Sequence, residues 1–318
     1  MTVIFRTLGW LALAVTLSVH PALACSLPEG PARAVVAVID GDTLLLDDQS
    51  KLRLVGALRP SPPSANTPDA DWPPAAAAKE ALERMVTGQT VLLEFDQRTT
   101  DRYGQQLAQA FVVNEDGGFW LQGRMVEEGL ARAYSFPDNS GCAAELVQLE
   151  AGARALGLGI WANAAYNVRE ANKTDDLLRY TGSYQLVSGV VAEAANSKGR
   201  VFLDFGADWH TDFTASIEPK SRQMFEKAGF DLLSLKGKTV RVRGWIESAN
   251  GPQIKVTHPG QIEVVDEDGS AASIGTRAET SVEVPALEEP PVEALAASAS
   301  SLAEPPPETA QQAAATPN

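Results

Sequence analysis

Short strand-forming runs separated by turn residues fill two blocks of the chain, and this pattern limits the fold more than any other feature. The first block has five such runs and three helix-like segments between residues 33 and 161. The second block, from about 181 to 265, has five runs and one helix-like segment. Short runs in this number are typical of small closed β-barrels. The sequence therefore predicts a mainly β, α+β fold with two barrels in series.

Gly, Pro and Asp-Gly turn signals set the expected element boundaries. In the first block we expect strands at 35–39, 43–46, 52–55, 90–95 and 107–113, and helices at 75–86, 120–128 and 143–155. In the second block we expect strands at 184–192, 201–205, 213–217, 239–246 and 253–256, and a helix at 219–229. The domains predicted from these elements are 33–163 and 181–265, joined by a polar linker over 164–180.

The N-terminus has the pattern of an export signal. Arg6 precedes an apolar run from Leu8 to Val19, which the small-residue string Ala22-Leu23-Ala24 follows. Such a run is too short to span a bilayer comfortably, and an A-x-A string is a cleavage site. The sequence predicts that residues 1–24 are a signal peptide and that the mature protein is exported, either to the periplasm or out of the cell. No other stretch approaches a transmembrane length.

The chain has two cysteines, and one of them would become the first mature residue. Cys25 follows the predicted cleavage site, and Cys142 follows Ser140-Gly141. Cysteines in an exported chain usually pair. The alternative is a lipid anchor at Cys25, but Ala22 stands where a lipobox normally has Leu. The sequence favours a Cys25–Cys142 disulfide over a lipid anchor.

Acidic residues dominate the charge, above all near the C-terminus. The chain has 26 Lys and Arg against 41 Asp and Glu, for a net charge of −15. Residues 266–318 alone carry ten acids and one base, with many Ala and Pro, and we expect this acidic tail to be disordered. Since affinity for nucleic acid rests largely on neutralising phosphates, this balance argues against a general polyanion binder. Two Cys and three His exclude zinc-finger arrays and multi-histidine metal centres.

The first block contains four short sequence motifs in a specific order. They are Ile39-Asp40-Gly41-Asp42-Thr43, Arg53-Leu54-Val55-Gly56, Thr100-Asp101-Arg102-Tyr103-Gly104, and a closing segment from Gly129 to Tyr134 with Gly159-Ile160-Trp161 beyond it. In this order and spacing, over about 130 residues, the chain resembles the staphylococcal nuclease-like, or thermonuclease, family. The resemblance implies a five-stranded OB-fold barrel with three helices. It also implies, for active members, calcium-dependent cleavage of DNA and RNA phosphodiesters.

The resemblance assigns five catalytic positions, and only two of them keep the functional group. Asp42 stands at the first calcium carboxylate and Arg53 at the first phosphate-binding arginine. The second carboxylate, the general base and the second arginine are replaced by Leu58, Ser61 and Gln105. Asp42 is thus at most a weak metal ligand, because calcium is usually anchored by more than one carboxylate. Asp40 and Asp42 could instead serve only as turn residues.

Three further residues near these positions affect the metal site. Arg59 places a cation beside the metal position, where it would repel calcium. Asp69 and Asp71 could rebuild a metal site, but nothing in their spacing requires it, and loop carboxylates are usually solvated. No cofactor is therefore expected, except calcium if the protein is an active nuclease.

Candidate nucleic-acid contacts come from both blocks. Tyr103 and Tyr134 match nucleotide-contacting aromatics of the family, although a tyrosine in a small barrel often serves in packing. In the second block, period-two alternation puts Val240, Val242 and Ile246 on one strand face. The opposite, outward face carries Arg241, Arg243 and Trp245, residue types that suit single-stranded nucleic acid. The alternative, which the block's 10 bases and 9 acids favour, is a solvated strand face with Trp245 half-packed. This second block resembles small OB-like modules appended to some bacterial thermonuclease-like proteins.

Three functions remain open on the sequence alone. The favoured one is an exported, non-catalytic binding or scaffolding protein with a degenerate nuclease site. The second is a calcium-dependent nuclease with a rearranged site. The third is a cell-envelope module that binds protein or glycan. The partners expected are single-stranded nucleic acid or an envelope protein.

Overall fold

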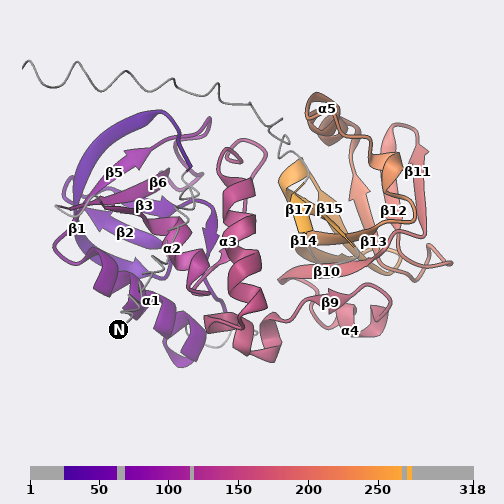
Figure 1. The fold of residues 1–318 in the computed structure, drawn as a ribbon, viewed down its shortest axis with the longest axis horizontal. Helices are drawn as coiled ribbons and strands as arrows, with labels where there is room; N and C mark the ends of the chain where they lie inside the picture. The colour runs from indigo at the N-terminus through magenta and orange to yellow at the C-terminus, as the bar shows by residue number, and fades with distance from the viewer. Residues whose placement is uncertain (1–24, 63–68, 115–117, 267–270, 274–318) are drawn as a thin grey trace, which may run out of the picture. The chain divides into compact units, whose positions relative to one another are not determined.

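The computed structural model describes residues 25–62, 69–114, 118–266 and 271–273 (Figure 1). All of them belong to one compact unit that ends at Thr276. The predicted signal peptide and nearly all of the predicted acidic tail lie outside the described residues. Within the described part of the chain, no helix is long and apolar enough to cross a membrane.

The first barrel is a closed ring of five strands. Its strand order is β3-β2-β1-β5-β6, and β6 pairs in parallel with β3 to close the ring. A short strand β7 (Phe119–Trp120) extends the sheet beside β6, and β4 (Ala57–Leu58) pairs with β8 (Arg132–Ala133). The ring strands are β1 (Glu29–Asp40), β2 (Thr43–Leu46), β3 (Lys51–Leu54), β5 (Thr90–Glu94) and β6 (Gln106–Val113). The predicted OB-like barrel with five strands is therefore confirmed.

Three helices accompany this barrel, as predicted: α1 (Pro73–Val86), α2 (Leu121–Glu127) and α3 (Ala143–Ala155). Pro73 opens α1, where a missing N–H costs no hydrogen bond, and the buried face of α1 repeats at helical spacing through Ala78 and Leu82. The chain then packs Gly129 against Gly159, and a Cβ on Gly129 would lie 2.3 Å from the Leu158 carbonyl oxygen. Three short 3-10 helices also lie in this part of the chain: η1 (Asp69–Asp71), η2 (Gly159–Ala162) and η3 (Ala164–Tyr166).

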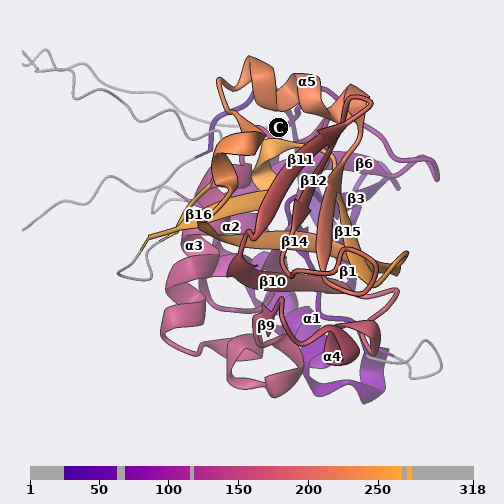
Figure 2. The ribbon, with the colours of Figure 1, turned by 90° about the vertical axis from the view of Figure 1, so that its right-hand side faces the viewer.

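The second barrel repeats the strand order of the first. Its sheet follows β11-β12-β13-β15-β14-β10, and β10 and β11 are two parts of one bent stretch of chain (Figure 2). In both barrels the third and fifth strands pair in parallel, β3 with β6 and β13 with β15. The strands are β10 (Tyr184–Val190), β11 (Glu193–Ser197), β12 (Arg200–Asp204), β13 (Thr214–Ile217), β14 (Thr239–Ser248) and β15 (Pro252–Val256). The second OB-like barrel is thus built on the same plan.

Shorter elements surround the second barrel. The helix α5 (Pro219–Lys227) lies between the third and fourth strands, as α1 does in the first barrel. The segment predicted as a polar linker is folded, because β9 (Arg169–Glu170) pairs with β10 and the helix α4 (Thr174–Leu178) follows. The remaining elements are β16 (Ile262–Val265), which pairs with β14, β17 (Ala271–Ser273), η4 (Leu232–Leu235) and η5 (Pro259–Gln261).

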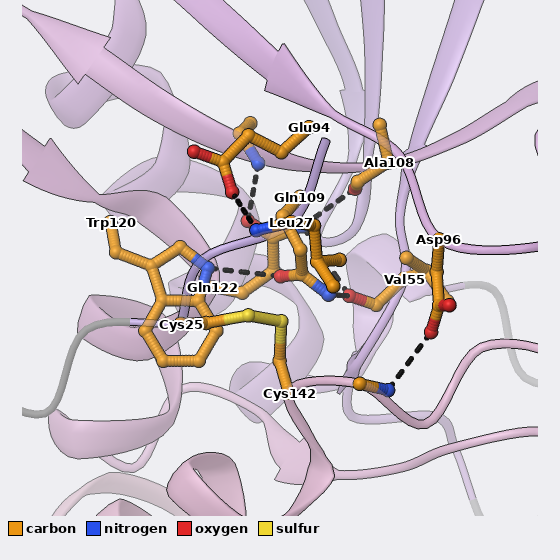
Figure 3. Close-up of a disulfide and its surroundings, with 12 residues drawn as sticks. Cys25, Leu27, Val55, Glu94, Asp96, Ala108, Gln109, Trp120, Gln122 and Cys142 are labelled. Carbon is orange, nitrogen blue, oxygen red and sulfur yellow. Dashed lines mark hydrogen bonds between the residues drawn. A yellow bond between two sulfur atoms is a disulfide. The ribbon is translucent and has the colours of Figure 1, made fainter. Parts of the chain in front are cut away.

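The predicted disulfide between Cys25 and Cys142 is present (Figure 3). Both cysteines are buried, and the bond ties the start of the described chain to the residue before α3. Hydrogen bonds hold the chain beside each cysteine independently of the sulfurs. The Leu27 amide donates to Glu94 Oε2 at 2.7 Å, and the Gly141 amide donates to Asp96 Oδ2 at 2.9 Å.

Candidate functional site

The turn between β1 and β2 carries the two aspartates of the first sequence string. The Asp42 amide donates to Asp40 Oδ1 at 3.0 Å, and Thr43 Oγ1 donates to Asp42 Oδ1 at 3.0 Å. Asp40 therefore caps the turn with its own side chain, which is common turn chemistry for aspartate. The turn is closely packed, since a Cβ on Gly41 would lie 3.2 Å from Arg59 Cβ. This packing brings Arg59 against the carboxylates.

The Arg59 guanidinium lies among three carboxylates. Its Nε is 3.7 Å from Asp40 Oδ2 and 3.9 Å from Asp42 Oδ1, and its Nη1 donates to Asp69 Oδ2. Arg53 approaches Asp42 from β3, with Nη2 at 3.9 Å from Asp42 Oδ2. Asp42 thus has an arginine near each of its carboxylate oxygens. The positive charges beside Asp42, the candidate metal ligand, therefore come from two arginines of the protein itself, Arg53 and Arg59.

Asp42 is an unusual carboxylate because its side chain is almost fully buried. Burial, together with the neighbouring Asp40 charge, raises the pKa of Asp42 from 3.8 to about 6, and Arg53 opposes that rise. The ionised form is therefore disfavoured in the folded protein. Because the folded pKa lies above the unfolded value, the folded protein loses stability as the pH rises from 3.8 through about 6.

Asp42→Asn is therefore expected to stabilise the protein at high pH. The difference in pKa corresponds to about 3 kcal/mol as an upper limit, and we expect a gain of about 1 to 3 kcal/mol at pH 8. At about pH 4 the gain should fall to about 0.5 kcal/mol, because Asp42 is then protonated in the folded state. Urea unfolding at the two pH values measures the difference. Asp47→Asn, at an exposed carboxylate beside Arg33, is the control, and an equal gain there would contradict the assignment to Asp42.

The three positions that differ from the family lie in β4, just beyond β4 and just before β6. Leu58 lies buried in β4 opposite Arg132, and Ser61 is exposed just beyond it. Gln105 directly precedes β6, whose Leu107 pairs with Arg53 in β3. The Gln105 amide donates to Asp101 Oδ1 at 2.9 Å, which shapes the loop before the strand. Of the described residues, no group of three or more His, Cys, Asp or Glu is arranged to hold a metal ion.

The two candidate tyrosines have different surroundings. Tyr103 is 71% exposed in the loop before β6. Tyr134 is half-buried, and its ring packs edge-on against Phe136 at 4.7 Å and against Tyr184 at 5.4 Å between centroids. Tyr184 belongs to the second barrel. Tyr134 is thus a contact between the barrels as well as a residue of the first one.

The prediction that Arg241 and Arg243 face outward from β14 is wrong for Arg243 and largely wrong for Arg241. The alternation itself is present, since Val240, Val242 and Ile246 are buried in the core of the second barrel. Arg243, however, is only 1% exposed, and the Arg241 side chain is largely covered. The first barrel covers this part of the strand. Only Trp245, at 49% exposed, presents an open surface there.

Two buried glutamates that the sequence reasoning missed account for the burial of Arg243. Arg243 Nη2 lies 2.8 Å from Glu150 Oε2 in α3 and also donates to Glu263 in β16. Its Nη1 donates to the Ala133 carbonyl at 3.1 Å, while Glu150 Oε1 accepts from the Ala133 amide at 2.9 Å. Arg241 Nη1 is 3.0 Å from Glu263 Oε2. These groups form a buried ion network that joins the barrels.

A second buried polar contact joins the barrels beside this network. Ser135 Oγ and His258 Nε2 are 2.6 Å apart. Burial, reinforced by the Arg243 charge, lowers the pKa of His258 to about 4, so the imidazole is neutral at neutral pH. Nothing in the spacing of a lone histidine could have revealed a partner 123 residues away.

The fold and the turn with Asp42 and Arg53 define a nuclease-like OB barrel. Residues 51–163 match the family described as "Staphylococcal nuclease homologue". The thermonuclease of Staphylococcus hyicus is 34% identical over 132 residues, which cover 41% of this chain and 75% of that protein. The thermonuclease of Staphylococcus intermedius is 33% identical over 135 residues, covering 42% and 77%. The chain belongs to the staphylococcal nuclease family, and its second barrel lies beyond the matched residues.

The residues at the family's metal position do not fit calcium in this chain. Calcium takes six to eight oxygen ligands, commonly from several carboxylates. Here the second carboxylate position holds Leu58, and the Arg59 guanidinium already lies within 4 Å of both Asp40 and Asp42. A divalent cation would have to displace a positive charge that three carboxylates hold.

Proposed function

We propose that this protein uses the nuclease fold to bind nucleic acid and does not cleave it. The observation that carries the proposal is the Arg59 guanidinium, which contacts Asp40, Asp42 and Asp69 where a nuclease would hold its metal. An internal cation neutralises the remaining carboxylates permanently, whereas a metal would also polarise a phosphoryl oxygen. The arrangement keeps the turn and its carboxylates but leaves no place for a metal that would polarise a phosphoryl oxygen.

The magnitudes of the lost groups support the same proposal. A general base contributes about 10² to 10⁴ in rate, and Ser61 is a poor base at neutral pH. One charge-stabilising donor contributes about 10² to 10³, and Gln105 carries no charge. Such losses need not multiply, but together with the missing metal ligand they leave little of a normal turnover.

Nucleic acid is the ligand class that the family relationship favours. Arg53 remains partly exposed beside Asp42, and Tyr103 and Trp245 present aromatic surfaces. Aromatic side chains and a few arginines can hold a single strand without reading its sequence. The first domain carries 11 Lys and Arg against 18 Asp and Glu, so we expect modest, salt-sensitive affinity. The Cys25–Cys142 disulfide supports an oxidising compartment outside the cytoplasm.

The purified mature chain is expected to show at most trace cleavage of a fluorescent oligonucleotide in millimolar calcium. Asp42→Ala should then look the same as wild type. Leu58→Asp, Ser61→Glu and Gln105→Arg together restore the missing groups, but we expect this triple variant to stay inactive while Arg59 holds the carboxylates. Adding Arg59→Ala should raise cleavage by at least about tenfold, because the metal position is then free.

The matched control is Arg98→Ala in the triple background, since Arg98 is an exposed arginine that pairs with Asp138 in the same barrel. Circular dichroism checks that each variant folds. Robust wild-type cleavage that both Asp42→Ala and Arg53→Ala abolish would contradict the proposal and establish a rearranged nuclease site. Equal cleavage with Arg98→Ala and Arg59→Ala would remove the special role of Arg59.

A further inference from the structure

A pocket of about 360 Å³ opens where the two barrels meet. Leu58, Trp72 and Arg132 line it from the first barrel, and Arg179, Tyr184 and Trp245 line it from the other side. We call it the junction pocket. Pockets of a few hundred Å³ are the usual size for small organic ligands. Most of its far wall lies beyond residues 51–163, which match the nuclease family.

Arg132 is a buried cation on the wall of this pocket, and its charge is poorly compensated. It is only 7% exposed, and its Nη1 donates to the Tyr184 carbonyl. Its Cζ lies 5.2 Å and 5.1 Å from the ring centroids of Tyr166 and Tyr184. In the described ranges no carboxylate lies within 4 Å of Arg132, and its Nε has no hydrogen-bond partner.

Burial lowers the pKa of Arg132, yet a guanidinium stays protonated in a protein. A buried charge is unfavourable unless a counter-charge or several hydrogen bonds compensate it. Two tyrosine faces, one carbonyl and the more distant charge of Glu150, which already pairs with Arg154 and Arg243, supply only part of that compensation. An anion that enters the pocket would supply the rest.

The other walls favour a ligand that is both anionic and flat. Arg179 adds a second, exposed cation, and the described lining has no Asp or Glu. Trp245 is half-exposed, and Trp72 is held in place because its Nε1 donates to the Tyr166 hydroxyl at 3.0 Å. Indole faces stack on planar rings, and guanidinium groups pair with phosphate or carboxylate. The pocket offers both surfaces in a volume that a mononucleotide can fill.

We propose that the junction pocket binds a nucleotide: an organic anion with a flat ring, its phosphate at Arg132 and Arg179 and its ring against Trp245. Two of the replaced positions, Leu58 and Ser61, line the pocket, whereas Asp42 and Arg53 do not. The proposal therefore concerns binding in the pocket and not cleavage at the Asp42–Arg53 site. The same chemistry could come from a free mononucleotide or from the phosphorylated end of a strand.

Calorimetric titration of the mature chain with adenosine 5′-monophosphate tests the proposal. Saturable binding is expected, with adenosine and inorganic phosphate each weaker by at least about tenfold, because each supplies one half of the contact. Trp245→Ala should weaken binding by about tenfold and Arg179→Gln by about fivefold. Both side chains are exposed, so these variants should fold. Arg132→Gln should abolish binding, provided that its circular dichroism matches wild type.

Two matched variants control for general effects. Trp209→Ala removes a tryptophan that is 57% exposed elsewhere in the second barrel. Arg222→Gln removes an exposed arginine that pairs with Glu226. Neither should change the affinity. Tighter binding of a short oligonucleotide with a 5′-phosphate than of the mononucleotide identifies a strand end as the source, and weaker binding identifies free nucleotide.

Three results would overturn the proposal. The first is no saturable binding at millimolar nucleotide. The second is equal loss of affinity in Trp209→Ala and Trp245→Ala. The third is loss of binding in Arg53→Gln with no effect of Arg179→Gln, which would place the nucleotide at the Asp42–Arg53 site of the first barrel. None of these outcomes bears on cleavage, so they are separate from the test of the proposed function.

Discussion

The double variant Cys25→Ser with Cys142→Ser is expected to lose about 4 to 5 kcal/mol of unfolding free energy. The disulfide joins residues 117 positions apart, and the chain-entropy model gives about this value for a closed loop of that length. The effect arises mainly in the unfolded chain, because Leu27 and Gly141 keep their own hydrogen bonds to Glu94 and Asp96 (Figure 3). Urea unfolding of the variant against the oxidised wild type measures it.

Two comparisons make this expectation specific. Wild type reduced with a phosphine should lose a similar amount, because both proteins lack the cross-link, although the serines are smaller and more polar than the buried thiols. The dependence of unfolding free energy on urea should steepen in both, since an open unfolded chain exposes more surface. A loss below about 1 kcal/mol would mean that the native bond is strained enough to offset the entropic gain.

The sequence predicted the barrels well because local signals decide them. The Asp-Gly turn after β1, the proline that opens α1 and the strand alternation all act over a few residues. The Cys25–Cys142 pair was predictable for a different reason, since an exported chain with two cysteines offers one intramolecular pairing. The folded segment at β9 and α4 was missed, because its polar composition masks the backbone pairing with β10.

The candidate site was predictable only in part. Aligning the family's motifs predicted that Leu58, Ser61 and Gln105 stand where the family has carboxylates and an arginine. The alignment also placed a cation, Arg59, beside the metal position. It did not predict that Asp69, in η1, pairs with Arg59. Asp69 was a candidate for rebuilding a metal site. In the structure its carboxylate instead accepts a hydrogen bond from Arg59, which also lies beside Asp40 and Asp42.

The error at β14 has a physical cause. Period-two alternation divides a strand into two faces, but it does not tell what covers each face. Arg243 carries a charge, and charged residues are almost never fully buried unless they are paired. Its partner Glu150 is 93 positions away on a helix of another barrel, so no local pattern links the two. Burial alone would lower the pKa of Arg243, but Glu150 and Glu263 together raise it above its usual value.

Arg243→Met is expected to destabilise the protein by about 3 to 5 kcal/mol. Removing one member of a buried ion network leaves the charges of the others uncompensated. Here the buried Glu150 and Glu263 would keep only Arg154 and Arg241, which are partly exposed, as partners.

Arg243→Lys should lose part of this amount, because an ammonium cannot contact the Ala133 carbonyl and both glutamates as the guanidinium fork does. Arg200→Met is the matched control. Arg200, in strand β12 of the second barrel, also pairs with a glutamate, but on the surface, at 2.7 Å from Glu218. Its loss should cost less than about 1 kcal/mol. Thermal and urea unfolding of the three variants measures the differences. Equal effects of Arg243→Met and Arg200→Met would contradict a buried network that holds the barrels together.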